Sequence, residues 1–220
     1  MRTPLVIVGA GGHATVVADV AELSGYDVIG FTDDVNVKRH GTAFCHATVL
    51  GGVEQLALLA ARGVRHAVVA VGDCEARLSL ANRVCRDGLQ LVALCHPASS
   101  VGRDCTIGPG TLLMAGAIVN SGAMIGAHVI VNTAASVDHE CRIEDGVHVG
   151  PGVRLGGRVE VGRGSWLGIG SVIKDGVRIG AGTIVGAGSL VLRDLPSGVV
   201  AFGSPATIVR PVIHVQAARR

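Results

Sequence analysis

Aromatic residues are almost absent from this sequence of 220 residues, which has one Trp, one Tyr and three Phe. A globular core built mainly from aromatic side chains is therefore excluded. Long apolar runs are missing too, because none reaches the roughly 18 residues that a membrane-spanning helix needs. No signal peptide is evident before Gly9, so we expect a cytoplasmic protein with no membrane partner.

The sequence also lacks cysteine pairs with metal-site spacing and an excess of one charge. No CxxC pair occurs, and the cysteines are Cys45, Cys74, Cys85, Cys95, Cys105 and Cys141. This distribution is typical of free thiols in a reducing compartment. The formal net charge of +2 gives no reason to expect a nucleic-acid partner.

What the sequence does contain is a repeat with a period of six residues. From Val101 to Val191 every sixth residue is Val, Ile or Leu. Neither a strand nor a helix has this period, whereas one short strand plus a corner takes six residues. Three such units close a triangular coil of about 18 residues, and stacked coils pair in parallel about 4.8 Å apart. The sixteen positions are Val101, Ile107, Leu113, Val119, Ile125, Val131, Val137, Ile143, Val149, Leu155, Val161, Leu167, Ile173, Ile179, Val185 and Val191.

Each repeat unit has a second inward position, two residues before the aliphatic one. Small or β-branched residues occupy it almost throughout, as a narrow interior requires. Glycine directly follows nine of the sixteen aliphatics, and we assign it to the backbone conformations of tight corners. A thin prism of just over five coils has little core of its own, so we expect its faces to pack against other copies.

The first 95 residues alternate between strand and helix patterns. Continuous apolar runs and helical periodicity predict strands at 4–8, 27–31, 66–71 and 90–94, and helices at 16–23, 53–61 and 75–86. This order predicts a small parallel sheet with helices on both faces, which amounts to half of a Rossmann fold.

Ligands of such sheets bind beyond the carboxyl ends of the strands. The candidate binding residues there are Gly11, Gly12, His13, Asp33, Asp34 and Gly72. The Gly9-x-Gly11-x-x-Ala14 spacing matches a dinucleotide fingerprint, with Asp33 placed to meet a ribose. Because only one half-sheet precedes the repeat, we favour a single nucleotide or nucleotide sugar over NAD. A tight strand-to-helix turn without a ligand is the plainer alternative.

One repeat unit departs from the others by placing His139 between Asp138 and Glu140. A carboxylate beside an imidazole can orient the ring and raise its basicity, so His139 is the candidate general base. A thiol mechanism through Cys141 is the rival hypothesis. The register of the repeat counts against it, because Cys141 falls on an inward position.

Two further histidines lie in the repeat, His128 and His148. His148 should face outward, either as a solvated side chain or in contact with a ligand. A zinc site built from these two histidines and His139 is the metal alternative. Their spacings of 11 and 9 residues do not align on one repeat position, so we expect no metal.

Several segments together resemble a known family. They are Gly9-Ala10-Gly11-Gly12-His13, Val71-Gly72-Asp73, the six-residue repeat, Val137-Asp138-His139-Glu140-Cys141 and Gly203-Ser204-Pro205-Ala206. The chain resembles the sugar O-acyltransferase, sialic-acid O-acetyltransferase family over almost its whole length. Within it the chain is most similar to nucleotide-amino-sugar N-acetyltransferases of the bacillosamine and perosamine kind.

The resemblance implies an architecture in three parts. Residues 1–95 would form an α/β, half-Rossmann-like domain that binds a nucleotide sugar. Residues 96–195 would form a left-handed parallel β-helix, and residues 196–220 a closing segment and tail. The implied assembly is a homotrimer with active sites between neighbouring subunits.

The resemblance also implies roles for single residues. His139 would be the general base and Glu140 the residue that raises its basicity, although Asp138 leaves open which carboxylate orients the ring. The nucleotide sugar would be held by Gly11, Gly12, His13, Asp33, Asp34 and Gly72. The groove for the cosubstrate acetyl-CoA would be lined by His148, Gly157, Ile169 and Ala187, the last of which is glycine in some relatives.

The implied activity is direct, acetyl-CoA-dependent N-acetylation of the 4-amino group of a UDP- or GDP-linked 4-amino-4,6-dideoxysugar, in O-antigen or other glycan biosynthesis. Two alternatives remain open at this point. One is O-acetylation of a sialic-acid-like sugar, and the other is a non-catalytic or metal-dependent solenoid.

Overall fold

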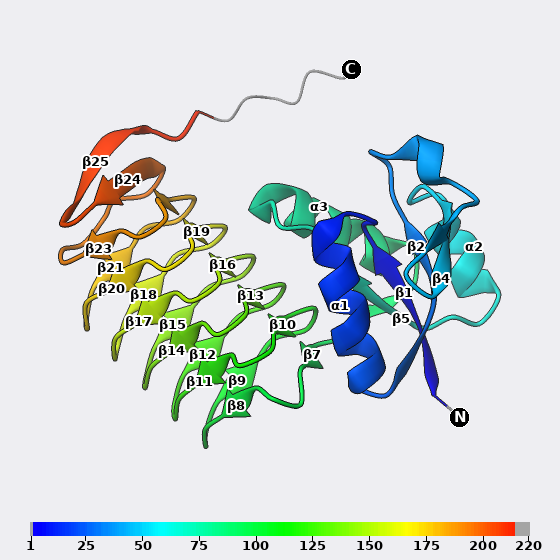
Figure 1. Ribbon diagram of the computed structural model, residues 1–220, viewed down its shortest axis with the longest axis horizontal. Helices are drawn as coiled ribbons and strands as arrows, with labels where there is room; N and C mark the ends of the chain where they lie inside the picture. Colours follow the sequence, from blue (N-terminus) through cyan, green and yellow to red (C-terminus); the bar gives the residue numbers. More distant parts are fainter. Residues whose placement is uncertain (1, 214–220) are drawn as a thin grey trace.

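The computed structural model describes residues 2–213, which form an α/β domain followed by a long stack of triangular coils (Figure 1). The α/β domain contains the helices α1 (Gly12–Leu23), α2 (Gln55–Ala61) and α3 (Cys74–Arg86) and the short 3-10 helix η1 (Val37–Arg39). Its strands are β1 (Thr3–Val8), β2 (Tyr26–Thr32), β3 (Ala43–Phe44), β4 (Ala47–Gly51), β5 (His66–Val69) and β6 (Gln90–Leu91).

These strands form one sheet in the order β3-β4-β2-β1-β5-β6, parallel except for the β3–β4 hairpin at one edge. Helix α1 packs on one face of the sheet, where Val17 lies in the same cluster as Leu5 and Ile7. The other face carries α2 and α3, with Leu56 and Val84 packed against β1 and β5. The predicted sheet with helices on both faces is confirmed, whereas the β3–β4 hairpin was not predicted.

The predicted strand at 90–94 was wrong in one respect. It divides into β6, which completes the α/β sheet, and β7 (Leu94–Cys95), which pairs with the first full coil of the repeat. The boundary between the two sheets therefore falls inside what looked like one strand.

The repeat is a left-handed parallel β-helix with three flat faces, as predicted. The first face contains β7, β10 (Leu112–Leu113), β13 (Ile130–Val131), β16 (His148–Val149), β19 (Trp166–Leu167) and β22 (Ile184–Val185). The second face contains β8 (Ser100–Val101), β11 (Ile118–Val119), β14 (Ser136–Val137), β17 (Arg154–Leu155), β20 (Val172–Ile173) and β23 (Leu190–Val191). The third face contains β9 (Thr106–Ile107), β12 (Met124–Ile125), β15 (Arg142–Ile143), β18 (Glu160–Val161) and β21 (Arg178–Ile179).

The periodic aliphatic residues fill the interior of the coils. From Leu113 to Val191 every one of them is buried, together with the small residue two positions earlier. The exceptions are Val101, which is 44 % exposed, and Ile107, which is partly buried, because each lies in the first strand of its face and has no coil below it. Partners lie 18 residues apart, as in the pairing of Val119 with Val137. The predicted inward register is therefore confirmed away from the open end.

The interpretation of the glycines that follow the aliphatics was wrong. The left-handed backbone conformation occurs two residues later, for example at Gly146 (φ +67°) and Gly164 (φ +67°). The glycines next to the aliphatics are needed for another reason, which is the close approach of the next coil. A Cβ on Gly108 would lie 2.5 Å from the backbone nitrogen of Ala127.

A hairpin closes the C-terminal end of the stack. Strand β24 (Val199–Gly203) pairs with β22, and β25 (Ala206–Pro211) runs antiparallel to β24. The rest of the predicted tail, residues 214–220, lies outside the described residues. Between residues 2 and 213, no helix has both the length and the apolar character needed to cross a bilayer.

The two domains share one hydrophobic cluster. Leu112 and Ile130, which point outward from the first face, are fully buried together with Ala14 and Val17 of α1. Helix α1 thus lies between its own sheet and the β-helix, as Figure 1 shows. This shared core fixes the α/β domain on the first face.

Shortening a side chain inside the coils should destabilise the protein strongly. Leu167 is fully buried, so Leu167→Ala should lower the free energy of unfolding in urea by about 2–5 kcal/mol. Lys174, which follows the next strand along the chain, β20, is exposed. Lys174→Ala should change the free energy of unfolding by less than about 0.5 kcal/mol. Equal effects of the two variants would contradict the inward register.

Candidate active site

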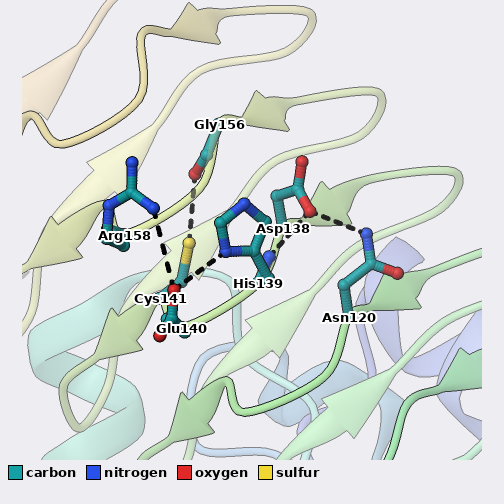
Figure 2. A network of polar contacts seen from close by, with 7 residues as sticks. All are labelled: Asn120, Asp138, His139, Glu140, Cys141, Gly156 and Arg158. Carbon is teal, nitrogen blue, oxygen red and sulfur yellow. Dashed lines mark hydrogen bonds and ion pairs between the residues drawn. The ribbon is translucent and has the colours of Figure 1, made fainter.

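His139 lies at the corner between the second and third faces, in the turn that joins β14 to β15. Figure 2 shows its side chain beside those of Asp138, Glu140 and Arg158. The following residue, Glu140, has φ +57°, the left-handed conformation that recurs at these corners. The corner thus turns the His139 side chain away from the interior, and about half of it is exposed.

The two nitrogens of the His139 ring have different surroundings. Nδ1 lies 3.1 Å from Oε2 of Glu140, which can only accept a hydrogen bond when ionised. Nδ1 therefore carries the proton and Nε2 has a free lone pair. Gly157 lies against Nε2, where any side chain would collide with the ring. The arrangement presents Nε2 as a base.

The structure separates the roles of the two carboxylates. Glu140 contacts the ring, and the same oxygen lies 3.8 Å from Nη1 of Arg158. Asp138 instead accepts hydrogen bonds from Asn120 Nδ2 (2.9 Å) and from the backbone N–H of His139 (2.7 Å). These two hydrogen bonds lower the pKa of the Asp138 carboxyl group. Asp138 holds the turn, and Glu140 orients the ring.

Cys141 is fully buried, as its register predicted. Its thiol donates to the carbonyl oxygen of Gly156 at 3.2 Å, and burial raises the pKa of the thiol. Both features disfavour the thiolate that a nucleophilic mechanism needs. Among residues 2–213, no group of three His, Cys, Asp or Glu side chains is arranged to hold a metal ion.

A cleft of about 320 Å³ lies beyond the carboxyl ends of β1, β2 and β5. Its lining includes Gly9, Asp33, Asp34, Val71 and Ser79. This is the edge at which parallel α/β sheets bind their ligands. Of the six binding residues predicted from the sequence, Asp33 and Asp34 line this cleft.

The glycine-rich turn begins helix α1. Gly11 is the N-cap residue, Gly12 is the first residue of the helix, and both are exposed. A Cβ on either would meet no atom within 4 Å, so protein packing does not require glycine at these positions. The open space in front of them suits the close approach of a ligand to the backbone.

Asp33 and Asp34 differ in their availability. Oδ2 of Asp33 accepts from the N–H of Ala10, and Oδ1 accepts from the N–H groups of Val35 and Asn36, all at 2.8 Å. Burial alone would raise the pKa of Asp33, but these hydrogen bonds outweigh it and the pKa is lowered. Asp33 thus shapes the loop, whereas Asp34 is exposed with one oxygen bonded to the N–H of Val53.

His148 differs from the solvated side chain that we considered. It points outward from the first face but is only 8 % exposed, because the α/β domain covers it. Nδ1 lies 3.1 Å from the carbonyl oxygen of Gly72, and Nε2 lies 3.1 Å from Nδ2 of Asn132. A carbonyl only accepts, so Nδ1 donates to Gly72 and Nε2 accepts from Asn132. The ring also stacks on Trp166, with centroids 5.9 Å apart.

The other predicted site residues occupy different corners of the coil. Ile169 is 63 % exposed, and its carbonyl accepts from the N–H of Gly188, next to Ala187 one coil further on. These residues lie between the first and second faces, whereas Gly157 lies with His139 between the second and third. His13 lies near His148, with ring centroids 6.4 Å apart. One chain alone therefore does not bring Ile169 and Ala187 next to His139.

Two family models match parts of the chain. A family model described as the PglD N-terminal domain matches residues 4–84, and one described as bacterial transferase hexapeptide (six repeats) matches residues 158–193. No curated protein matches the sequence.

Several solved structures are similar over nearly the whole chain. Perosamine N-acetyltransferase from Caulobacter crescentus, solved as a His-to-Asn variant in complex with CoA and GDP-perosamine, is 38% identical. The alignment covers 95% of this chain and 98% of that one, with a TM-score of 0.91. The chain belongs to the hexapeptide-repeat family of nucleotide-amino-sugar N-acetyltransferases.

Two further structures resemble this acetyltransferase. The acetyltransferase domain of PglB from Neisseria gonorrhoeae, in complex with acetyl coenzyme A, is 34% identical, with coverage of 95% and 100% and a TM-score of 0.88. WeeI from Acinetobacter baumannii is 24% identical, with coverage of 94% and 100% and a TM-score of 0.81, a likeness of fold. The predicted family, fold and enzyme class are thereby confirmed.

Three residues at the domain junction of this acetyltransferase carry no signal in the sequence. They are Arg77, Asn132 and Trp166, which contact Gly72 or His148. Arg77 lies within the predicted helix 75–86, and two of its hydrogen-bond partners, His128 and Gly146, lie 51 and 69 residues away in sequence. No local pattern reports such contacts.

Acid should destabilise this acetyltransferase through its buried histidines. Burial, together with the charge of Arg77, lowers the pKa of His13 to about 4, and burial also lowers that of His148 to about 4. In the unfolded chain both should titrate near 6.5. Between these values the unfolded state binds more protons, so stability should fall as the pH is lowered from about 6.5 towards 4.

Urea unfolding at several pH values measures this dependence. His148→Gln should make the loss of stability with falling pH smaller, and a substitution of the exposed His46, His46→Gln, serves as the control. An unchanged pH dependence in His148→Gln would show that protonation of His148 is not coupled to folding.

Proposed function

We propose that this acetyltransferase transfers the acetyl group of acetyl-CoA to the 4-amino group of a nucleotide-linked 4-amino-4,6-dideoxysugar. The observation that carries the proposal is the free Nε2 of His139, oriented by Glu140 on a hexapeptide scaffold. The similarity to an enzyme solved with CoA and GDP-perosamine supports this substrate class. It also favours GDP over UDP as the nucleotide.

The reaction proceeds by direct transfer between two bound substrates. Nε2 of His139 accepts a proton from the amine as its nitrogen attacks the thioester carbonyl carbon of acetyl-CoA. The tetrahedral intermediate then collapses, the carbon–sulfur bond breaks, and an amide remains. The imidazolium returns its proton to the thiolate of CoA. Glu140 stabilises the imidazolium while it exists.

The two substrates would occupy different parts of the protein. The cleft at Asp33 and Asp34, with the open turn at Gly11, Gly12 and His13 and the nearby Gly72, would hold the nucleotide sugar. Acetyl-CoA would lie along the coils, where Ile169 and Ala187 are exposed one above the other. Gly157 would leave room beside the base, and His148 would border both parts.

We further propose a homotrimer that works in the cytoplasm. His139 and the pair Ile169 and Ala187 lie on opposite edges of the second face, so a second copy is needed to bring both to one active site. The second face itself exposes apolar side chains at Ile118 (37 %) and Val172 (42 %), which suits contact with another subunit. A cyclic trimer would form three such sites.

Ligand-induced stabilisation should distinguish the substrates. GDP and CoA should each raise the midpoint of thermal unfolding, because each binds the folded state. UDP should raise it less than GDP at equal concentration. Stabilisation by CoA without either nucleotide would instead favour O-acetylation of a free sugar, and stabilisation by no ligand would favour a non-catalytic solenoid.

Removing the base should abolish most of the turnover but not nucleotide binding. His139→Ala should lower kcat by about 10²-fold or more, measured as CoA release with a GDP-linked 4-amino sugar. The matched control is Cys141→Ala at the neighbouring inward position, where alanine fits as Ala123 does, and it should keep kcat within about threefold. Unchanged turnover in His139→Ala would refute its role as the base.

A further inference from the structure

Arg77 of helix α3 is a fully buried guanidinium group. Its acceptors are main-chain carbonyl oxygens and the thiol of Cys74, and they include no carboxylate. Burying a charge that has no carboxylate within hydrogen-bond distance carries a large desolvation penalty. The position of Arg77 is therefore not explained by an ion pair, and what it provides is a set of hydrogen bonds from one planar group.

The acceptors come from both domains. Nη1 donates to the carbonyls of Val71 (2.9 Å) and Gly72 (2.8 Å), just beyond β5 at the nucleotide edge of the sheet. Nε donates to the carbonyl of His128 (2.8 Å), and Nη2 to that of Gly146 (2.6 Å). His128 and Gly146 occupy the same corner in consecutive coils, 18 residues apart. One planar group thus joins the end of a nucleotide-domain strand to two coils of the β-helix.

The carbonyl of Gly72 receives a second donor from the β-helix. Nδ1 of His148 lies 3.1 Å from the same oxygen that accepts from Arg77. The carbonyl of Gly72 therefore accepts hydrogen bonds from α3 of its own domain and from the first face of the β-helix. Since its neighbour Val71 lines the nucleotide cleft, these bonds fix the cleft relative to the coils.

A van der Waals contact supports the same junction. Gly146 faces Leu78, the residue after Arg77, so closely that a Cβ on Gly146 would lie 2.6 Å from Cδ1 of Leu78. The equivalent glycine one coil later, Gly164, has the same φ of +67° and nothing within 4 Å of its Cβ position. At this corner of the coils, α3 therefore packs closely against Gly146 but not against Gly164.

We propose that Arg77 is a positioning residue that sets the distance and angle between the nucleotide-sugar cleft and the acetyl-transfer groove. The inference rests on the proposed function. Arg77 touches neither substrate; it acts through the carbonyls of Gly72, His128 and Gly146. A displacement of about 1 Å between two bound reactants can lower the rate by about 10²-fold while each still binds.

The first test separates transfer from binding. Arg77→Met should lower kcat for a GDP-linked 4-amino sugar by about 10²-fold, while the Kd values of GDP and CoA stay within about threefold. Arg77→Lys keeps the charge without the planar fork and should recover only part of the rate. Arg83→Met on the same helix is the control, because Arg83 makes a surface ion pair with Asp87.

The second test displaces α3 without changing Arg77. Gly146→Ala should lower kcat in the same way as Arg77→Met, because the new methyl group pushes against Leu78. Gly164→Ala introduces the same backbone strain without the collision and should stay near wild type. This pair keeps the proposal testable even if Arg77→Met does not fold.

A readout independent of turnover comes from Trp166, the only tryptophan, whose ring stacks on His148 at the junction. Its fluorescence should change in Arg77→Met and Gly146→Ala but not in the two controls. Wild-type kcat and fluorescence in a folded Arg77→Met or Gly146→Ala would overturn the proposal, and so would a loss of GDP affinity as large as the loss of kcat. Absence of turnover in the wild-type protein would instead refute the proposed function, and the fluorescence comparison would still test the junction.

Discussion

The narrow interior of the triangular coil is the constraint on which the rest of the structure depends. Each six-residue unit has room inside for one aliphatic and one small side chain, and from Leu113 to Val191 these positions are buried without exception. Polar chemistry is thereby restricted to corners and outer faces. His139 is available as a base because it lies at a corner, and Cys141 is unavailable as a nucleophile because it lies two residues later, inside.

The second constraint is the junction between the two domains. Helix α1 is buried between its own sheet and the first face of the coils, so the nucleotide cleft has a fixed position on the β-helix. The apolar contacts of α1 bury surface between the two domains. The hydrogen bonds of Arg77 and His148 set the orientation of one domain on the other. An arrangement of this kind suits a direct transfer, in which two bound substrates must meet at one base.

The sequence predicted the parts of the molecule that depend on local periodicity. The register of the coils, the outward position of His139, the inward position of Cys141 and the strand ends that line the cleft all follow from residue spacing. It misassigned the glycines after the aliphatics, because their purpose is the approach of a coil 18 residues away. It also gave no indication that His148 and Arg77 are buried, since each is covered in part by atoms of the other domain.

Direct transfer moves the acetyl group from acetyl-CoA to the nucleotide-linked amine in one step, without an acetylated protein. Rapid mixing of the enzyme with acetyl-CoA labelled in the acetyl group and a GDP-linked 4-amino sugar tests it. Direct transfer predicts that the label passes into the nucleotide sugar as an alkali-stable amide, with no covalently labelled protein at any time. Label that first accumulates on the protein, or product whose label is released by mild alkali as from an ester, would contradict it.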